Sequence, residues 1–461
     1  MKKGGKNSGL LFLLIFLTVQ GFSQADSTHK DTVLTSVVET KSKVSGQVRY
    51  FFMSTDNKEP FTDYYAHAIS AYVKYERGFG KYLKFAAGAS AIYNISSSDL
   101  VRIDTLTKRS NRYEVQLFDL RYPDKRISYR LEELYLQYAL PKGMIRVGSQ
   151  LINTPFINPQ DGRMRPTFVS GIYTNLSFTS IQVQGGWIAG ILPRSISRWY
   201  SAGSSIGLNP QGINTDGTVS NYGGHLSSNG IFLGGISRNF SQGIKLKFWE
   251  QYVDKIFNTA MLQMDLEHNL WDKAKFLSSL QYTNQVKIGN GGSSELSKGY
   301  FTANKPAQAI STMTGIESDR FEASLNYTRI FKGARFLMPR EWGREPFFTF
   351  MPRERNEGSG DMQAFVIKTA YHIPKAGLKF SLQAGHFQLP DVKNAALNKY
   401  GMPSYNQLNA EVRISPKAAP KLDLQFLYVY KDNRGNTYQN PGYVFNKVNM
   451  SLYNLVVNYN W

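Results

Sequence analysis

The side chains in this sequence that could do chemistry are charged residues at every second position of apolar segments. In the segment 44–53, for example, Arg49 alternates with Val48, Tyr50 and Phe52. Charges that share one face in this way form a fixed field, which concentrates counter-ions and orients small polar molecules. In the other alternating segments, the charged residues likewise stand on the face opposite the apolar residues, and we call this alternation of faces the parity of the segment. The residues on the charged face are the basic Arg49, Lys74, Lys84, Arg146, Lys245, Lys247, Lys368, Lys379 and Arg413 and the acidic Glu76, Glu133, Asp265, Glu267, Glu322, Glu411 and Asp423. The alternative for each is an ordinary solvated charge or one paired across strands.

The sequence carries no recognisable catalytic motif. None of its six histidines stands at an HExxH or other metal spacing, and no GxSxG elbow, Walker loop or dinucleotide fingerprint occurs. The absence of cysteine excludes a thiol nucleophile, a zinc finger and a disulfide scaffold. Ser381 and His386 differ in parity, so they cannot form a hydrolytic pair on one strand face. We expect no enzyme, no metal and no cofactor.

The elements that must position the charges are β-strands. Alternation of apolar and polar residues with a period of two indicates half-buried strands. Mean hydropathy is −0.35, and no apolar run after residue 20 reaches the roughly 20 residues that a membrane-spanning helix needs. Eighteen candidate strands follow, at 44–53, 66–77, 82–93, 128–140, 143–151, 172–179, 181–190, 229–237, 244–255, 258–267, 275–286, 307–318, 321–329, 362–372, 378–387, 405–415, 421–431 and 447–461.

The connections between these strands alternate in length. The links 78–81, 141–142, 374–377 and 416–421 are short and rich in Pro and Gly, whereas the links 94–127, 152–171, 191–228, 287–306, 330–361, 388–404 and 432–446 are long. Short periplasmic turns opposite long surface loops are typical of bacterial outer-membrane barrels. The sequence therefore predicts an all-β fold, a transmembrane antiparallel β-barrel of about eighteen strands. A soluble β-sandwich would not sort its loops in this way.

The N-terminus predicts export through the secretory pathway. Three lysines precede the short apolar run 10–19, and Gly21 and Ser23 supply the small residues that signal peptidase prefers before Gln24. The alternative is an uncleaved membrane anchor. We predict a signal peptide at 1–23, a polar periplasmic lead-in at 24–43 and a single barrel domain at 44–461, located in the bacterial outer membrane.

The final segment predicts an assembly signal. Tyr453, Leu455, Val457, Tyr459 and Trp461 alternate with polar residues, and the chain ends on an aromatic ring. Aromatic residues at strand ends favour the lipid–water boundary. Tyr459 and Trp461 are therefore expected to be read by the barrel assembly machinery. An ordinary amphipathic edge strand is the alternative.

Two stretches resemble the OprD-type porins. The segment 46–56 (GQVRYFFMSTD) is similar to the first strand of that family, and the segment 145–178 has the same order of strand, proline-containing loop and following strand. Within it, Gly162, Arg163, Pro166, Thr167, Phe168 and Gly171 occur in the same order as the Gly, Arg, Pro, Thr, Phe and Gly of the family's segment. The resemblance implies an eighteen-stranded monomeric barrel whose third surface loop, here 152–171, folds inward as a constriction.

The resemblance also implies which residues line the pore. A family ladder of arginines guides carboxylate groups, and Arg49 matches the first-strand arginine. The segment 424–427 (LQFL) lacks the arginines that the family carries there. We predict that Arg49, Glu133, Arg146, Arg163, Arg165, Lys379, Glu411 and Arg413 line the pore and set its selectivity, and that Pro155, Asp161, Gly162, Pro166, Phe168 and Gly171 belong to the constriction loop.

The predicted function is passive diffusion of small hydrophilic solutes, with carboxylate-bearing amino acids or organic acids as the candidate class. The alternative is a plugged surface barrel that acts as an adhesin or structural protein. In the loop 330–361, Arg340, Arg344 and Arg353 stand among aromatic residues, where they could trap carboxylates or anchor to phosphates of outer-leaflet lipopolysaccharide. The net charge of +20 comes with no nucleic-acid-binding motif. The expected partners are lipids, the assembly machinery and small solutes.

Overall fold

A computed structural model describes residues 41–160, 162–240, 243–271 and 273–461. The predicted signal peptide at 1–23, nearly all of the predicted lead-in at 24–43, and Asp161 of the predicted constriction loop lie outside the described residues. Within those ranges no helix is both long and apolar enough to cross a membrane. The helical segments described there are the short turns η1 (Glu114–Leu117), η2 (Leu296–Lys298), η3 (Arg340–Trp342) and η4 (Pro441–Tyr443).

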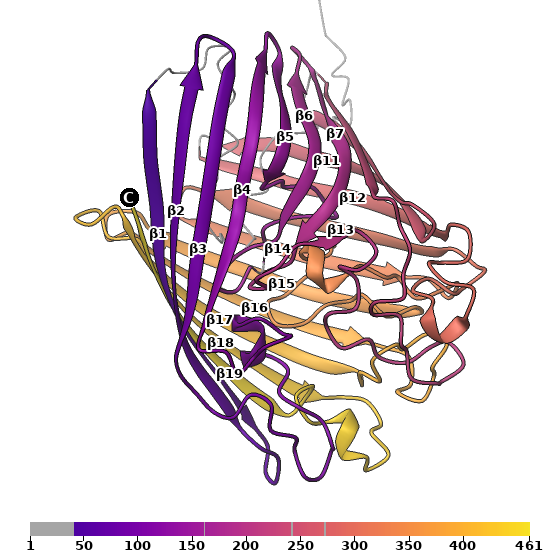
Figure 1. The fold of residues 1–461 in the computed structure, drawn as a ribbon. Helices are drawn as coiled ribbons and strands as arrows, with labels where there is room; N and C mark the ends of the chain where they lie inside the picture. Colours follow the sequence, from indigo (N-terminus) through magenta and orange to yellow (C-terminus); the bar gives the residue numbers. More distant parts are fainter. Residues whose placement is uncertain (1–40, 161, 241–242, 272) are drawn as a thin grey trace, which may run out of the picture.

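The chain forms one closed antiparallel barrel of eighteen long strands, as the sequence predicted (Figure 1). A two-residue strand, β8 (Tyr200–Ser201), pairs with the end of β7. The long strands are β1 (Ser42–Asn57), β2 (Tyr64–Phe79), β3 (Leu83–Ser97), β4 (Ile127–Leu140), β5 (Gly143–Gln150), β6 (Phe168–Ser177), β7 (Ile181–Leu192), β9 (Ile231–Asn239), β10 (Ile244–Val253), β11 (Phe257–Trp271), β12 (Ala274–Lys287), β13 (Ala307–Ser318), β14 (Phe321–Ile330), β15 (Met362–Ile373), β16 (Leu378–Gln388), β17 (Tyr405–Ile414), β18 (Leu422–Asn433) and β19 (Met450–Asn460).

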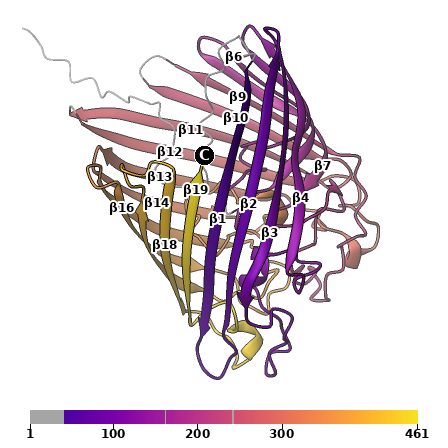
Figure 2. The ribbon, with the colours of Figure 1, turned by 60° about the vertical axis from the view of Figure 1, so that its left-hand side comes forward.

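The barrel closes where its first and last long strands meet. β1 pairs with β19 from Gln47–Asn460 to Asn57–Met450, and Figure 2 shows the two strands side by side. At the end of this seam the backbones of Gly46 and Trp461 exchange two hydrogen bonds of 3.1 Å. A Cβ atom at Gly46 would lie only 2.2 Å from the Trp461 ring, so glycine lets the terminal indole lie across the seam.

Alternation along the strands separates the outer face from the interior. Along β1, Arg49, Phe51 and Met53 are buried, whereas Tyr50 and Phe52 are only half-buried on the opposite face. Large apolar side chains are exposed on the outer face of nearly every strand, as a lipid-facing surface requires. The parity read from the sequence is thereby confirmed.

One β-bulge places two consecutive carboxylates inside the barrel. The register between β3 and β4 shifts between Gly88 and Ala89, opposite Glu132. Because a bulge adds one residue to one strand, it reverses the side-chain parity beyond that point. Glu132 and Glu133 are both buried, while Leu131 and Leu134 are both exposed. A strict period of two predicts only Glu133 inside.

The constriction loop is shorter than predicted. Phe168 and Gly171 belong to β6, which begins at Phe168, so the prediction that they lie in the loop is wrong. Their backbones pair with neighbouring strands, Gly171 facing Gly148 of β5. A Cβ atom on Gly171 would lie 2.1 Å from the Trp187 carbonyl of β7, so only glycine permits this close approach at the bulge there.

The long connections fold into one end of the barrel instead of standing free. A single buried cluster joins Ile157 of segment 151–167, Ile206 of segment 193–230, and Trp342 and Phe347 of segment 331–361 to inward residues of the wall. The Trp342 side chain is completely buried, and its indole N–H donates to Ser205 Oγ at 2.9 Å. These three inward segments therefore support one another and narrow the interior.

Candidate functional site: the interior of the barrel

A buried ion pair joins the constriction loop, segment 151–167, to strand β4 of the barrel wall. Arg165 of segment 151–167 donates from Nε to Glu132 Oε1 at 2.9 Å and from Nη2 to Glu132 Oε2 at 2.5 Å. Its guanidinium lies 4.1 Å from the centre of the Tyr72 ring. Arg130 forms a second ion pair with Glu132 at 3.3 Å, and it also donates to the Pro166 carbonyl at 3.0 Å. This network fixes the loop to β4.

Arg49 attaches the same loop to the barrel seam. It donates from Nε to Asn458 Oδ1 on β19 at 2.7 Å and from Nη1 to the Arg163 carbonyl at 2.6 Å. Arg163 has a φ of 53°, in the left-handed region, which turns the loop at that point. Arg49, Arg163 and Arg165 are all nearly inaccessible to solvent. The structure thus brings three predicted pore arginines together, in positions that hold the constriction loop.

The remaining predicted wall charges lie near the short-turn end, each with a partner. Glu133 pairs with Lys74 at 3.0 Å, and Arg146 donates to Gln137 at 2.8 Å. Lys379 of β16 pairs with Glu322 of β14 at 3.0 Å, and Arg413 pairs with Glu411 of the same strand, β17, at 3.5 Å. Glu133–Lys74 and Lys379–Glu322 are ion pairs between strands, the alternative that the sequence left open. The side chains of Lys379, Glu411 and Arg413 remain partly accessible to solvent, whereas Glu133 is buried.

Segment 331–361 lies within the barrel, so its arginines do not reach lipid phosphates. Arg353 donates to Asn454 of β19 at 3.0 Å, and Arg340 pairs with Glu357 at 2.5 Å over the Tyr400 ring. The interpretation that Arg340 and Arg353 anchor to the outer leaflet is wrong. Inside the barrel, Arg340 pairs with the carboxylate of Glu357, and Arg353 donates a hydrogen bond to Asn454.

Ionisable groups within the inward segments hold the segments together. Burial disfavours a charged Glu354, but Arg112 and Lys431 outweigh that effect and hold its pKa well below its usual range. Lys431 pairs with Glu354 at 2.9 Å. These contacts attach the segment 331–361 to β18 and to segment 98–126.

Two further inward groups have pKa values near neutrality. Burial raises the pKa of Glu345 to about 7, although the backbone N–H of Asn356 and the charge of Arg355 act in the opposite direction. Burial likewise lowers the pKa of Lys399 to about 7. The Lys399 ammonium donates to Tyr222 at 2.9 Å.

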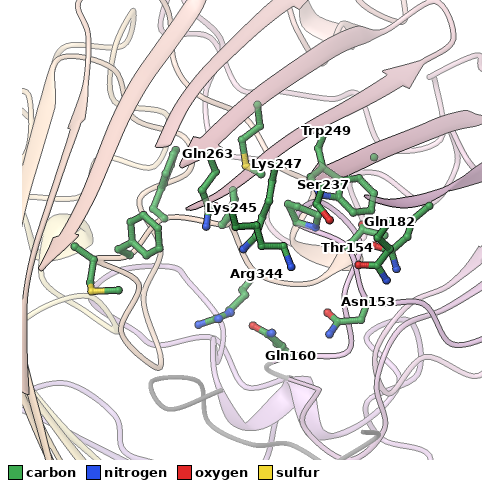
Figure 3. A pocket seen from close by; sticks show the side chains of 18 of the residues that line it. Asn153, Thr154, Gln160, Gln182, Ser237, Lys245, Lys247, Trp249, Gln263 and Arg344 are labelled. Carbon is green, nitrogen blue, oxygen red and sulfur yellow. The ribbon is translucent and has the colours of Figure 1, made fainter. Parts of the chain in front are cut away.

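A cavity of about 330 Å³ opens beside the constriction loop (Figure 3). Its walls come from β7, β9, β10, β11, β13, β14 and β15 and from the inward segments 151–167 and 331–361. Lys245 and Lys247 line the cavity from β10, and Figure 3 shows Arg344 of the inward segment 331–361 near them. Lys368 of β15 completes a set of four basic lining residues. None of the described lining residues is Asp or Glu.

Sequence parity placed the three cavity lysines inside the barrel but did not single them out. Of the predicted site residues that the structure describes, only Arg344 and Pro155 line the cavity. Parity also missed Glu132 and Arg130, which hold the constriction loop. The adjacent pair Glu132–Glu133 between exposed leucines was the available signal, because neither carboxylate can face lipid without a cost of several kcal/mol.

A closed barrel with an apolar exterior, a charged interior and inward loops defines an outer-membrane channel. Residues 40–332 match the sequence profile of the outer membrane porin, OprD family, and the chain belongs to this family. It is therefore a protein of the bacterial outer membrane, in contact with lipids, that admits small solutes by passive diffusion.

Solved structures show the same fold at low sequence identity. The chain is similar to the outer membrane protein opdK of Pseudomonas aeruginosa, with a TM-score of 0.69, 12% identity, and coverage of 91% of this chain and 98% of that one. OccAB3 of Acinetobacter baumannii gives a TM-score of 0.69 at 16% identity, covering 92% of this chain and all of that one. OpdK of P. aeruginosa in complex with vanillate gives 0.68 at 11% identity, with coverage of 91% and 98%. No curated protein sequence matches.

Proposed function

We propose that this porin passes small carboxylate-bearing solutes and that the cavity beside the constriction loop is their binding position in the channel. The observation that carries the proposal is that four basic side chains, those of Lys245, Lys247, Arg344 and Lys368, line one space inside the barrel. An interior of this composition favours anions over cations of the same size.

The remaining lining suits the body of a small organic acid. Trp249, Phe347 and Phe348 offer apolar surface, and Asn153 and Gln160 offer amides for hydrogen bonding. A guanidinium such as that of Arg344 matches a carboxylate with two parallel N–H donors. The volume of about 330 Å³ falls at the lower end of ordinary ligand pockets, which suits a small solute. A structural neighbour, OpdK, has been solved with vanillate, which carries one carboxylate.

The charges outside the cavity take two different roles in this proposal. Arg49, Arg163 and Arg165 set the width of the passage because they hold the constriction loop. Arg146, Lys379 and Arg413, with Glu411 and Glu133, shape the field at the periplasmic mouth. The protein acts as a monomer, and the barrel assembly machinery inserts it through its terminal strand.

Uptake into liposomes tests the proposal. We compare butyrate with butyramide, which has the same carbon chain and no charge, and we expect butyrate to enter faster. Arg344→Gln should lower butyrate entry about 3- to 10-fold and leave butyramide entry unchanged, because one charge at close range in a narrow channel contributes on this scale. Lys275→Gln is the matched control. Lys275 forms an ion pair with Glu267, with an N–O distance of 2.8 Å, and neither residue lines the cavity. Equal entry of both solutes, with no effect of Arg344→Gln, would refute the proposal.

A further inference from the structure

Another hollow lies on the outer face of the barrel, where the wall faces lipid. It is a groove of about 300 Å³ across the neighbouring strands β14 to β18 (Figure 1). Four aromatic side chains line it, each between 42 and 47% exposed, and these are Phe321, Tyr371, Phe380 and Phe426. An exposed apolar hollow of this kind marks a surface that binds another molecule.

The pairing of the strands sets the aromatic rings in one row. Phe321 of β14 faces Tyr371 of β15, which in turn faces Phe380 of β16. Val412 of β17 lies between Phe380 and Phe426 of β18 and continues the row. Aromatic rows near strand ends mark the boundary between hydrocarbon and headgroups, and the short turns of these barrels face the periplasm. The row therefore lies at the boundary of the periplasmic leaflet.

Small side chains next to the row leave the groove open. Leu382 of β16 stands between Thr369 of β15 and Ala410 of β17. The Thr369 hydroxyl donates to the Leu382 carbonyl at 3.3 Å, so it requires no partner from the lipid side. A hydrocarbon chain in this groove touches protein on its sides as well as beneath it, so it gains more van der Waals contacts than on a convex wall.

The turns beside the row are basic. Segments 319–320, 374–377 and 415–421 hold one acidic residue, Asp319, and four basic residues, which are Arg320, Lys375, Lys417 and Lys421. The side chains of all four basic residues are exposed. These turns lie beyond the rings on the side away from the hydrocarbon, which is where lipid phosphates lie.

The carboxylates near these turns on β14, β17 and β18 belong to the inner face of the wall. Glu322 pairs with Lys379 at 3.0 Å. Glu411 and Asp423 lie 3.5 and 3.9 Å from Arg413. Their charges are thus matched by basic residues of the inner face, and the turns retain their basic character toward lipid.

We propose that the groove binds one anionic phospholipid of the periplasmic leaflet, with an acyl chain among the rings and the phosphate at the basic turns. The apolar groove and the basic turns match the two parts of such a molecule in their order along the membrane normal. The inference goes beyond the proposed function, because it concerns the outer face of the barrel and requires no solute in the channel.

The test is native mass spectrometry of the purified porin with two lipids, phosphatidylglycerol and phosphatidylcholine. The two have the same acyl chains, and only phosphatidylglycerol has a net negative charge. In the unmodified protein we expect the first phosphatidylglycerol to be retained at a concentration about tenfold lower than the first phosphatidylcholine. Each basic side chain beside an anionic lipid contributes up to about fivefold.

Two variants separate the headgroup from the acyl chain. Lys375→Gln/Lys417→Gln should lower the preference for phosphatidylglycerol to about threefold or less, because it removes two of the basic side chains at the turns. Ala410→Leu fills the groove, so it should weaken retention of both lipids about threefold or more and leave the preference between them unchanged.

Matched controls make the same changes elsewhere on the barrel. Lys81→Gln/Lys142→Gln alters two short turns between β2 and β5, and Ala71→Leu alters an exposed position on the outer face of β2. Both should retain the two lipids as the unmodified protein does. Heat-modifiable mobility on gels shows that each variant has folded.

Three results would overturn the inference. Equal retention of the two lipids by the unmodified protein would show that the turns do not recognise the phosphate of an anionic lipid. A preference for phosphatidylglycerol that survives Lys375→Gln/Lys417→Gln would place the anionic lipid elsewhere. Retention unchanged by Ala410→Leu would show that the groove holds no acyl chain.

Discussion

Removing the charge of Glu132 should release the constriction loop. Glu132 accepts from Ser90 at 2.7 Å and from Arg165 at 2.5, 2.9 and 3.1 Å, and it forms an ion pair with Arg130 at 3.3 Å. Glu132→Gln replaces one acceptor oxygen by an N–H₂ donor that faces guanidinium donors. The buried guanidinium groups of Arg130 and Arg165 then lose the counter-charge that they share.

The expected cost is about 3–5 kcal/mol, the range for breaking one partner of a buried pair. A loss of this size is a large share of the roughly 5–15 kcal/mol that stabilises an ordinary domain. The loop is a smaller unit than the barrel, so we expect the loop to detach before the barrel unfolds. Single-channel recording should then show a larger and noisier conductance.

The control replaces both partners. Glu132→Gln alone leaves the buried guanidinium of Arg165 without its counter-charge. Glu132→Gln/Arg165→Met removes that guanidinium as well, so the thermal stability of the folded barrel should recover part of the loss. The conductance should remain high, because the loop still lacks its attachment. A Glu132→Gln protein with unchanged conductance and unchanged melting would refute the account of Glu132 as the loop's attachment point.

Four further predictions concern other parts of the chain. Burial raises the pKa of Glu345, so its contribution to stability is fully present below pH 4.5 and is lost as the pH rises through about 7; melting followed from pH 5 to 8 should fall with pH, and Glu345→Gln should flatten this dependence. Deleting Asn460 and Trp461 should lower the amount of heat-modifiable barrel in isolated outer membranes, because Trp461 closes the seam at Gly46; unchanged assembly would remove that role. Arg49→Ala/Arg413→Ala should shift the reversal potential in a salt gradient toward cations and slow carboxylate uptake by several-fold, and unchanged selectivity would leave these arginines as structural residues only. N-terminal sequencing of the mature protein should begin at Gln24, and recovery of Met1 would contradict the predicted cleavage.

The strands and their inward faces were predictable because they depend on local alternation alone. Every strand of a lipid-embedded barrel must present apolar residues outward, so a pattern such as Arg49 between Val48 and Tyr50 determines its own orientation. The long loops followed from the same pattern, since they are the stretches where alternation stops. The inward course of segment 151–167 was predicted from the resemblance to the OprD-type porins.

The candidate site was harder to predict, because its contacts join distant parts of the chain. The pairing of Arg165 with Glu132 requires a bulge that shifts parity by one residue, and a strict period of two cannot represent it. The cavity joins Lys245 and Lys247 of β10 to Arg344 of a loop about a hundred residues later. Alternation assigns each of these residues to the interior, but it carries no information on which of them share one cavity.

The most direct test of the central claim is the reversal potential of the purified, reconstituted protein in a gradient of potassium butyrate. The cationic cavity predicts that butyrate carries more of the current than potassium, so the reversal potential should have the sign of an anion-selective channel. It should move toward that of a cation-selective channel in Arg344→Gln. A reversal potential of cation-selective sign in the unmodified protein would contradict the claim that this porin passes small organic anions through the cavity.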